Sequence, residues 1–249
     1  MARGTFRPTG SLRVYLLGTL PQEAASRLQR RLIYDMGESD GVALVVCEHP
    51  TVATVGRLGS RRHLVPDDVE LNRLGIRVVW VNRGGGVILH GPGQLVGYVI
   101  GRLDAVGLNL QGWLDALHDA VVATLSEFDL PARLRDDAPG IFLDHARVAT
   151  VAVGVSRGVA HHGLTINLGN DLGLIHAVLN EPGPRNRPLR QTSMESRRGR
   201  PTPSPAVREA LARHLESRLG LTRRQVFTTH SFLGREVRLY ESRGFSQPV

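Results

Sequence analysis

A glycine-rich stretch, residues 82–98, limits what this chain can fold into more than any other feature. Six of its 17 residues are glycine, and glycine loses more conformational entropy on folding than any other residue. Such a sequence is usually tolerated where the backbone must come close to a ligand. Arg83 adds a fixed positive charge and His90 a group that titrates near neutral pH, and successive glycine N–H groups can form a nest for an anion or oxyanion. A glycine-rich hairpin without a ligand is the alternative.

The hydrophobic pattern predicts strands and helices that do not alternate regularly. Short apolar runs predict strands over residues 12–17, 41–47, 51–55, 76–81, 87–90, 94–100, 140–143, 147–155 and 163–168. Apolar residues at helical spacing predict helices over residues 21–36, 109–128 and 206–219. We therefore expect an α+β fold, a mixed central β-sheet with packed helices, rather than a doubly wound parallel sheet.

The chain divides into four segments on composition and pattern. Residues 1–10 are expected to be a flexible tail, 11–197 a catalytic or binding domain, 198–205 a proline-rich connector, and 206–249 a C-terminal helix and tail. Within them, residues 171–179 fit either a short helix or a loop. The last thirty residues are predicted to form a tail with one strand at 236–240.

The charged residues exclude several kinds of chemistry. All 31 basic residues are arginine, so the chain has no lysine base, no Schiff-base lysine and no phosphate-binding lysine. The net charge of +8 favours an acidic partner, whereas the 5% of aromatic residues argues against a nucleic-acid platform. No apolar run approaches the ~20 residues that a membrane span requires, so we expect no membrane segment.

Cysteine and histidine usage argues against a metal centre. The single cysteine, Cys47, excludes an internal disulfide and a cysteine-rich zinc site, and it favours a cytoplasmic location. His161 and His162 are neighbours on a predicted strand, so their side chains are expected on opposite faces of the sheet. We expect no metal and no cofactor.

Several motifs, in order along the chain, resemble the lipoyl (octanoyl) transferases, a family with the biotin/lipoate protein ligase fold. The resemblance covers roughly residues 12–194. It rests on the following motifs: Glu48-His49-Pro50 with Thr54-Val55-Gly56-Arg57, Arg83-Gly84-Gly85 with His90-Gly91-Pro92-Gly93-Gln94-Leu95-Val96-Gly97-Tyr98, Asp137-Ala138-Pro139-Gly140-Ile141, His162-Gly163-Leu164-Thr165-Ile166-Asn167, Asp171-Leu172 and Thr192-Ser193-Met194.

The resemblance implies a reaction, its partners and a pocket. Enzymes of this family take an octanoyl group from acyl carrier protein, which is acidic, and pass it to a lysine on lipoyl domains of 2-oxoacid dehydrogenase or glycine cleavage proteins. By matching, the substrate pocket would be lined by Arg83, Gly84, Gly85, Gly86, Val87, Ile88, Leu89, His90, Thr150, Val151, Ala152, Gly163, Leu164 and Thr165.

The chain departs from the family at the reacting groups. The family acylates a cysteine that a lysine activates, but Arg147 stands at the position of that lysine. An ungapped count from Asp171 places Glu181 at the position of the cysteine, and one inserted residue would place Pro182 there. Cys47 lies in an apolar strand and is expected to be structural and inert, with a raised pKa.

Three readings of these departures remain open. In the first, the chain is a transferase in which the acceptor amine attacks the bound thioester directly, with His90 or His162 as the base. In the second, it is an inactive homologue that binds acyl chains or a carrier protein. The third, an ATP-dependent ligase, is disfavoured because such enzymes use a lysine. We favour the transferase, and we predict no acyl-enzyme on a cysteine.

Overall fold

The computed structural model of the chain describes residues 10–183 and 188–233, and their main feature is an eight-stranded sheet. Its strand order is β11-β1-β2-β6-β10-β9-β8-β7. β1 is parallel to both of its neighbours, and every other pair is antiparallel. The bounds are β1 Ser11–Thr19, β2 Val42–Glu48, β6 Gln94–Arg102, β7 Arg133–Arg135, β8 Ala138–Leu143, β9 Ala146–Ser156, β10 Val159–Asn167 and β11 Arg223–Phe227.

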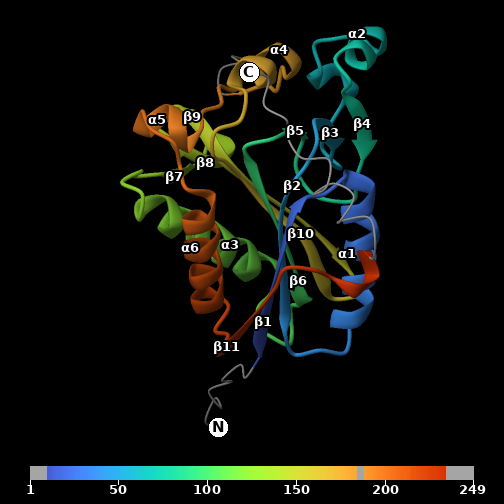
Figure 1. Cartoon of the computed structure of the whole chain (residues 1–249), viewed down its shortest axis with the longest axis vertical. Helices are drawn as coiled ribbons and strands as arrows, with labels where there is room; N and C mark the ends of the chain where they lie inside the picture. The colour runs from blue at the N-terminus through green and yellow to red at the C-terminus, as the bar shows by residue number, and fades with distance from the viewer. Residues whose placement is uncertain (1–9, 184–187, 234–249) are drawn as a thin grey trace, which may run out of the picture.

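Helices cover both faces of this sheet (Figure 1). Helix α1 (Gln22–Met36) packs on one face, and its buried leucines share a core with alternate residues of β1, β2 and β6. Helices α3 (Leu110–Ser126) and α6 (Ser204–Arg218) pack on the other face, in a second and larger core. The predicted α+β architecture, a mixed sheet with packed helices, is confirmed.

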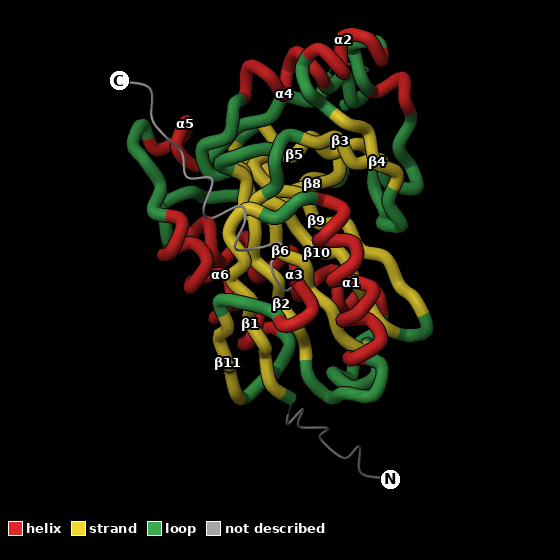
Figure 2. Tube along the Cα trace, turned by 45° about the vertical axis from the view of Figure 1, so that its right-hand side comes forward, coloured by secondary structure: helices red, strands yellow, loops and turns green. Residues whose placement is uncertain are grey.

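A smaller three-stranded sheet, of order β4-β3-β5, lies at one end of the molecule (Figure 2). Its strands are β3 Val52–Val55, β4 Arg77–Trp80 and β5 Val87–His90, with β3 parallel to β4 and antiparallel to β5. Helices α2 (Asp68–Arg73) and α4 (Leu172–Val178) close its outer side around a third core. Residues 171–179, which fitted a helix or a loop, are thus mainly helical.

The prediction that the last thirty residues form a tail is wrong in one respect: residues Arg223–Phe227 form β11, an edge strand of the main sheet. It pairs parallel to β1, with Ser11 opposite Arg223 and Tyr15 opposite Phe227. Its sequence carries little strand signal because its side chains are half-buried or exposed and include two arginines. The strand expected at 236–240 lies outside the described residues.

Other short elements were also not predicted from the pattern. They are α2, α5 (Met194–Arg198), β7 and two 3₁₀ turns at Arg61–His63 and Ser231–Leu233. Each is too short to show a full hydrophobic period. The two helices among them are capped locally: Asp67 and Glu70 form a reciprocal capping box at the start of α2, and the Ser193 side chain accepts from the Ser196 N–H at the start of α5. In the described ranges, no helix combines the length and apolarity needed to cross a membrane.

The packing of α6 on α3 gives the first prediction. Leu211 on α6 is fully buried in the core of that face, so Leu211→Ala should lower the free energy of unfolding by about 2–5 kcal/mol. Urea denaturation measures this change. Leu110→Ala, at a site that is 44% exposed on α3, is the control and should change the value by less than about 0.5 kcal/mol. Equal, small effects of the two changes would mean that α6 is not part of the domain core.

Candidate functional site

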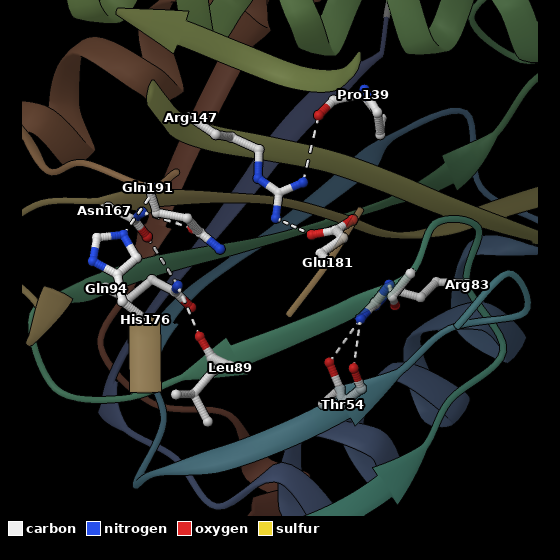
Figure 3. A network of polar contacts seen from close by, with 11 residues as sticks. Thr54, Arg83, Leu89, Gln94, Pro139, Arg147, Asn167, His176, Glu181 and Gln191 are labelled. Carbon is white, nitrogen blue, oxygen red and sulfur yellow. Dashed lines mark hydrogen bonds and ion pairs between the residues drawn. The ribbon is translucent and has the colours of Figure 1, made fainter. Parts of the chain in front are cut away.

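Arg83, in the loop before β5, is buried and holds the glycine-rich loop in shape. Its Nη1 donates to the carbonyls of Gly84 and Gly86, each at 3.0 Å, and its Nη2 donates to the carbonyl and hydroxyl oxygens of Thr54 at 3.0 and 2.8 Å. Figure 3 shows the guanidinium turned toward Thr54 on β3. Burial lowers the pKa of Arg83 to about 10, so the group stays charged at neutral pH. Its charge is engaged by the protein's own oxygens rather than offered to a ligand.

The loop around Arg83 is tied to the turn that follows β3. The N–H of Gly56 donates to the carbonyl of Gly86 at 3.0 Å, and the N–H of Leu58 to that of Gly85 at 3.1 Å. The two backbones approach so closely that a Cβ on Gly56 would lie 2.5 Å from the Gly85 oxygen and 2.6 Å from Nη1 of Arg83. Only glycine fits there, which explains why this turn contains one.

His90, at the end of β5, is part of a buried hydrogen-bonded chain. Its Nε2 lies 2.9 Å from the Thr54 hydroxyl, and its Nδ1 lies 2.8 Å from Oε1 of Gln94. The Gln94 amide donates in turn to Asn167 on β10 at 3.0 Å. Burial lowers the pKa of His90 well below its ordinary value, so the ring is neutral. Both ring nitrogens already have protein partners, which argues against His90 as the base that the sequence suggested.

A cavity opens between the small sheet and strands β6, β9 and β10. Water-sized spheres can be centred in about 20 Å³ of it, so the cavity is narrow. Eight of the pocket residues expected from the sequence line it: Arg83, Ile88, His90, Thr150, Ala152, Gly163, Leu164 and Thr165. Six further lining residues were not expected: Gln22, Thr54, Val81, Val96, Tyr98 and His162. Thr54, Val96, Tyr98 and His162 lie within the motifs already noted, so those motifs were the available signal.

The remaining expected residues lie beside the cavity or turn away from it. Val87 and Leu89 pack into the core of the small sheet, and Val151 packs against the α3 face. Because successive side chains of a strand point to opposite faces, only alternate residues of β5 and β9 face the cavity. Gly84, Gly85 and Gly86 form the loop next to it: the Gly84 N–H donates to Val153 at 2.9 Å, and a Cβ on Gly85 would meet Ala152 at 3.7 Å.

The two histidines of β10 do not point to opposite faces, so that expectation is wrong. The ring centroids of His161 and His162 are 5.0 Å apart, and His162 is also 6.0 Å from the ring of Tyr98. The cause is a left-handed backbone at His162, with φ of 59°, which breaks the alternation of the strand. Its N–H leaves the ladder and donates to Gln29 of α1 at 3.1 Å. In the described ranges, no group of three or more His, Cys, Asp or Glu residues could hold a metal ion.

Arg147, near the start of β9, forms an ion pair with Glu181, from the segment that follows α4 (Figure 3). Nη2 of Arg147 donates to Oε2 of Glu181, and Nη1 lies 3.5 Å from the carbonyl of Pro139. The side chains are 3% and 12% exposed, so the pair is almost fully buried. The two residues are 34 positions apart in the chain, and the fold brings them together beside the glycine-rich loop.

Known proteins are similar in sequence to this chain over most of its length. Residues 22–216 match the family model of the lipoyl protein ligase A/B catalytic domain. The octanoyltransferase of Geobacter metallireducens is 37% identical over 199 residues, which are 79% of this chain and 88% of that protein. The octanoyltransferase of Alkalilimnicola ehrlichii is 34% identical over 211 residues, 83% of this chain and 92% of that protein. The chain belongs to the octanoyltransferase family.

Solved structures share the fold of this octanoyltransferase family member. A lipoate-protein ligase A bound with ATP superposes with a TM-score of 0.70 at 21% identity, covering 96% of this chain and 97% of its own. A bipartite lipoate protein ligase of Thermoplasma acidophilum gives a TM-score of 0.67 at 19% identity, covering 96% and 94%. At such identities the likeness shows the fold alone, and it agrees with the biotin/lipoate ligase-like architecture expected from the motifs.

Within the octanoyltransferase family, the buried ion pair is the main departure of this chain. The motif match puts Arg147 at the family's lysine and, in an ungapped count, Glu181 at its cysteine, or Pro182 if one residue is inserted. The structure brings the side chains of Arg147 and Glu181 into direct contact. The carbonyl of Glu181 accepts a hydrogen bond from the Leu189 N–H at 2.9 Å, and the preceding N–H, of Asn180, donates to His63 at 2.9 Å. The backbone on both sides of Glu181 is therefore held in place.

Cys47 does not replace the family's cysteine in this octanoyltransferase. It is 3% exposed in the core between the main sheet and α1, and it is not among the residues that line the cavity. Burial raises the pKa of the Cys47 thiol, and Glu48 adds to the shift. The structural role expected for this cysteine agrees with its place in the core.

The buried histidines make the stability of the protein depend on pH. Burial lowers the pKa of His49 to about 4 and of His162 to about 3, and that of His90 also falls. The unfolded chain binds protons at these positions below about pH 6.5, whereas the folded chain does not. The free energy of unfolding should therefore be constant above pH 6.5 and fall below it, by about 1.4 kcal/mol per pH unit for each histidine.

Urea denaturation between pH 7.5 and 4.5 measures this dependence. His162→Asn keeps a residue that tolerates the left-handed backbone and removes one titrating group, so its slope below pH 6.5 should be shallower by about 1.4 kcal/mol per pH unit. The exposed His145→Gln is the control and should leave the slope unchanged. If the His162 variant has the wild-type slope, His162 is protonated in the folded protein.

The close approach at Gly56 gives a second prediction for the site. Gly56→Ala places a methyl group against two loop carbonyls and Nη1 of Arg83, so it should lower the free energy of unfolding by about 1–3 kcal/mol and disturb the loop. Gly91→Ala is the control, because its nearest contact would be the Thr51 hydroxyl at an ordinary 3.7 Å. Thermal denaturation of both variants tests this, and equal melting temperatures would contradict the geometry.

Proposed function

We propose that this octanoyltransferase passes an octanoyl group from acyl carrier protein directly to a lysine of a lipoyl domain, without an acyl-enzyme. The observation that carries the proposal is the cavity beside the glycine-rich loop. In a chain of this family it offers an apolar wall for the acyl chain. Beside the loop lies the buried Glu181–Arg147 ion pair, which the ungapped motif count matches to the family's cysteine and lysine. Neither member of that pair is a thiol or an amine.

The acyl chain would lie against the apolar part of the cavity wall. That wall consists of Val81, Ile88, Val96, Ala152 and Leu164, and burial of a hydrocarbon chain against such side chains is favourable by about 0.8 kcal/mol per methylene. The polar side of the cavity, with His90 neutral and bonded at both nitrogens, would hold the shape of the pocket rather than titrate during the reaction.

The thioester carbonyl would lie at the glycine-rich loop. Among the backbone–backbone hydrogen bonds of the described residues, none is donated by the N–H of Gly85 or Gly86. We assign these two donors to the oxygen that becomes negative when the amine attacks the carbonyl carbon. Preorganised N–H groups stabilise such an oxyanion, and holding both reactants in line lowers the barrier further.

The proposed partners are both proteins. Acyl carrier protein is acidic, which suits a chain with a net charge of +8. The acceptor would be a lipoyl domain of 2-oxoacid dehydrogenase or glycine cleavage proteins. The structural description of the Thermoplasma acidophilum ligase, which has a similar fold, names an E2 lipoyl domain as its partner in lipoylation. A cytoplasmic location, which the single cysteine favours, is part of the proposal.

Intact mass spectrometry tests this function. Purified protein mixed with octanoyl-acyl carrier protein and a lipoyl domain should add one octanoyl mass to the lipoyl domain and none to the enzyme. Cys47→Ser should transfer at the wild-type rate, because Cys47 is buried away from the cavity. An octanoyl adduct on the enzyme that hydroxylamine removes, and that the Cys47 variant lacks, would restore a thiol mechanism. Binding of octanoyl-acyl carrier protein without transfer would leave only the inactive homologue.

A further inference from the structure

We infer that the carboxylate of Glu181 accepts the proton of the attacking amine, and that Arg147 positions it for this role. The inference rests on the proposed octanoyl transfer and names the group that makes direct attack work. A protonated lysine cannot attack a carbonyl carbon, and the attacking nitrogen must lose a proton to become an amide. The reaction therefore needs a proton acceptor beside the thioester carbonyl.

The two oxygens of Glu181 have different surroundings. Oε2 accepts from Nη2 of Arg147, whereas none of the hydrogen bonds found among the described residues ends on Oε1. Oε1 also lies against the glycine-rich loop, because a Cβ built on Gly86 would be 3.2 Å from it. One oxygen is thus held by the protein while the other, beside the proposed oxyanion site, keeps its lone pairs for a substrate proton.

The position of the carboxylate is fixed from several directions. Arg147 is 3% exposed, and its own backbone is held by hydrogen bonds with Arg190 and Thr192, both 2.9 Å. The carbonyl of Glu181 is bonded to Leu189 at 2.9 Å. Because both the backbone of Glu181 and one of its carboxylate oxygens are held, the side chain loses little conformational entropy when substrate binds, which favours catalysis by proximity and orientation.

Glu181 lies against the glycine-rich loop next to the cavity rather than in its lining. The titratable groups that do line the cavity are less suited to this role. Both nitrogens of His90 are bonded within the protein. Burial lowers the pKa of His162 to about 3, so it is a weak proton acceptor, and Tyr98 donates to Gln22 at 3.3 Å. Burial also raises the pKa of Tyr98 well above its ordinary value. The chain contains no lysine, so Glu181 is left as the acceptor.

The step balances without any further reactant. The neutral lysine amine, whose ammonium proton has already passed to water, attacks the thioester carbonyl carbon and forms the C–N bond, and the one proton that the nitrogen must still lose passes to Oε1 of Glu181. The tetrahedral intermediate then breaks its C–S bond, and the electron pair leaves with the sulfur. The protonated Glu181 returns its proton to this thiolate. The products are the amide and the free thiol of the carrier, and Glu181 is a carboxylate again.

Steady-state transfer from octanoyl-acyl carrier protein to a lipoyl domain tests the role of Glu181. Glu181→Gln keeps the shape of the side chain and removes its basicity, so kcat should fall by about 100-fold or more while the KM for the carrier changes little. Glu127→Gln is the matched control, because Glu127 is also paired with an arginine, Arg213, but on the outer helices. It should keep the wild-type kcat.

Chemical rescue distinguishes a proton acceptor from a structural ion pair. Glu181→Ala opens a space beside Arg147 that small carboxylates fit, so added chloroacetate, formate and acetate should restore transfer. The restored rate should increase with the basicity of the carboxylate, whereas filling the space for structural reasons alone would give rates that do not follow basicity. Circular dichroism reports whether Glu181→Ala folds. If it does not fold, the kcat of Glu181→Gln alone tests the role of Glu181.

The possible results separate this inference from the proposed function. A wild-type protein that transfers nothing overturns both. A wild-type protein that transfers, with a Glu181→Gln variant whose kcat stays within about threefold of it, overturns only the role of Glu181. Rescue that is independent of basicity also overturns that role. A large loss of kcat in the Gln variant, with rescue that follows basicity in the Ala variant, establishes it.

Discussion

The buried guanidinium of Arg83 is the interaction on which the shape of the cavity depends. It joins two segments, because its donors reach Thr54 on β3 and the carbonyls of Gly84 and Gly86 in its own loop. Without it, the Gly84 carbonyl would lose its hydrogen-bond donor, at a cost of about 1–3 kcal/mol if it stayed buried. The same geometry explains Gly56, since the turn and the loop approach too closely for any side chain.

A second buried arginine changes the chemistry that the cavity can perform. Arg147 has the place of a lysine, but a guanidinium stays protonated and cannot activate a nucleophile. Its partner, Glu181, matches the family's cysteine in an ungapped count, and the two form an ion pair that is almost fully buried. Removing one partner of such a pair leaves an uncompensated buried charge, so the two substitutions suit each other. The role proposed for the pair is placement and proton transfer rather than covalent catalysis.

Most of the fold and part of the site could be predicted from the sequence. The strands with apolar runs and the helices with a clear period, such as α3, are found close to their expected bounds. The half-exposed β11 could not be predicted, because its pairing with β1 and not its own composition makes it a strand. The cavity lining was predicted for Ile88 and Leu164 but not for Gln22, which reaches the cavity from α1, far from any of the recognised motifs.

The sequence by itself determined the family, the α+β class and the absence of lysine chemistry. Those properties depend on residue type, order and spacing alone. Only the tertiary structure decided that Arg147 and Glu181 touch, that the charge of Arg83 is engaged within the protein, and that His161 and His162 lie side by side. The physical reason is that each outcome depends on the directions of the side chains. A single left-handed residue, such as His162, changes the side-chain direction that a regular strand would impose, and a close approach of two backbones, as at Gly56, excludes a side chain altogether.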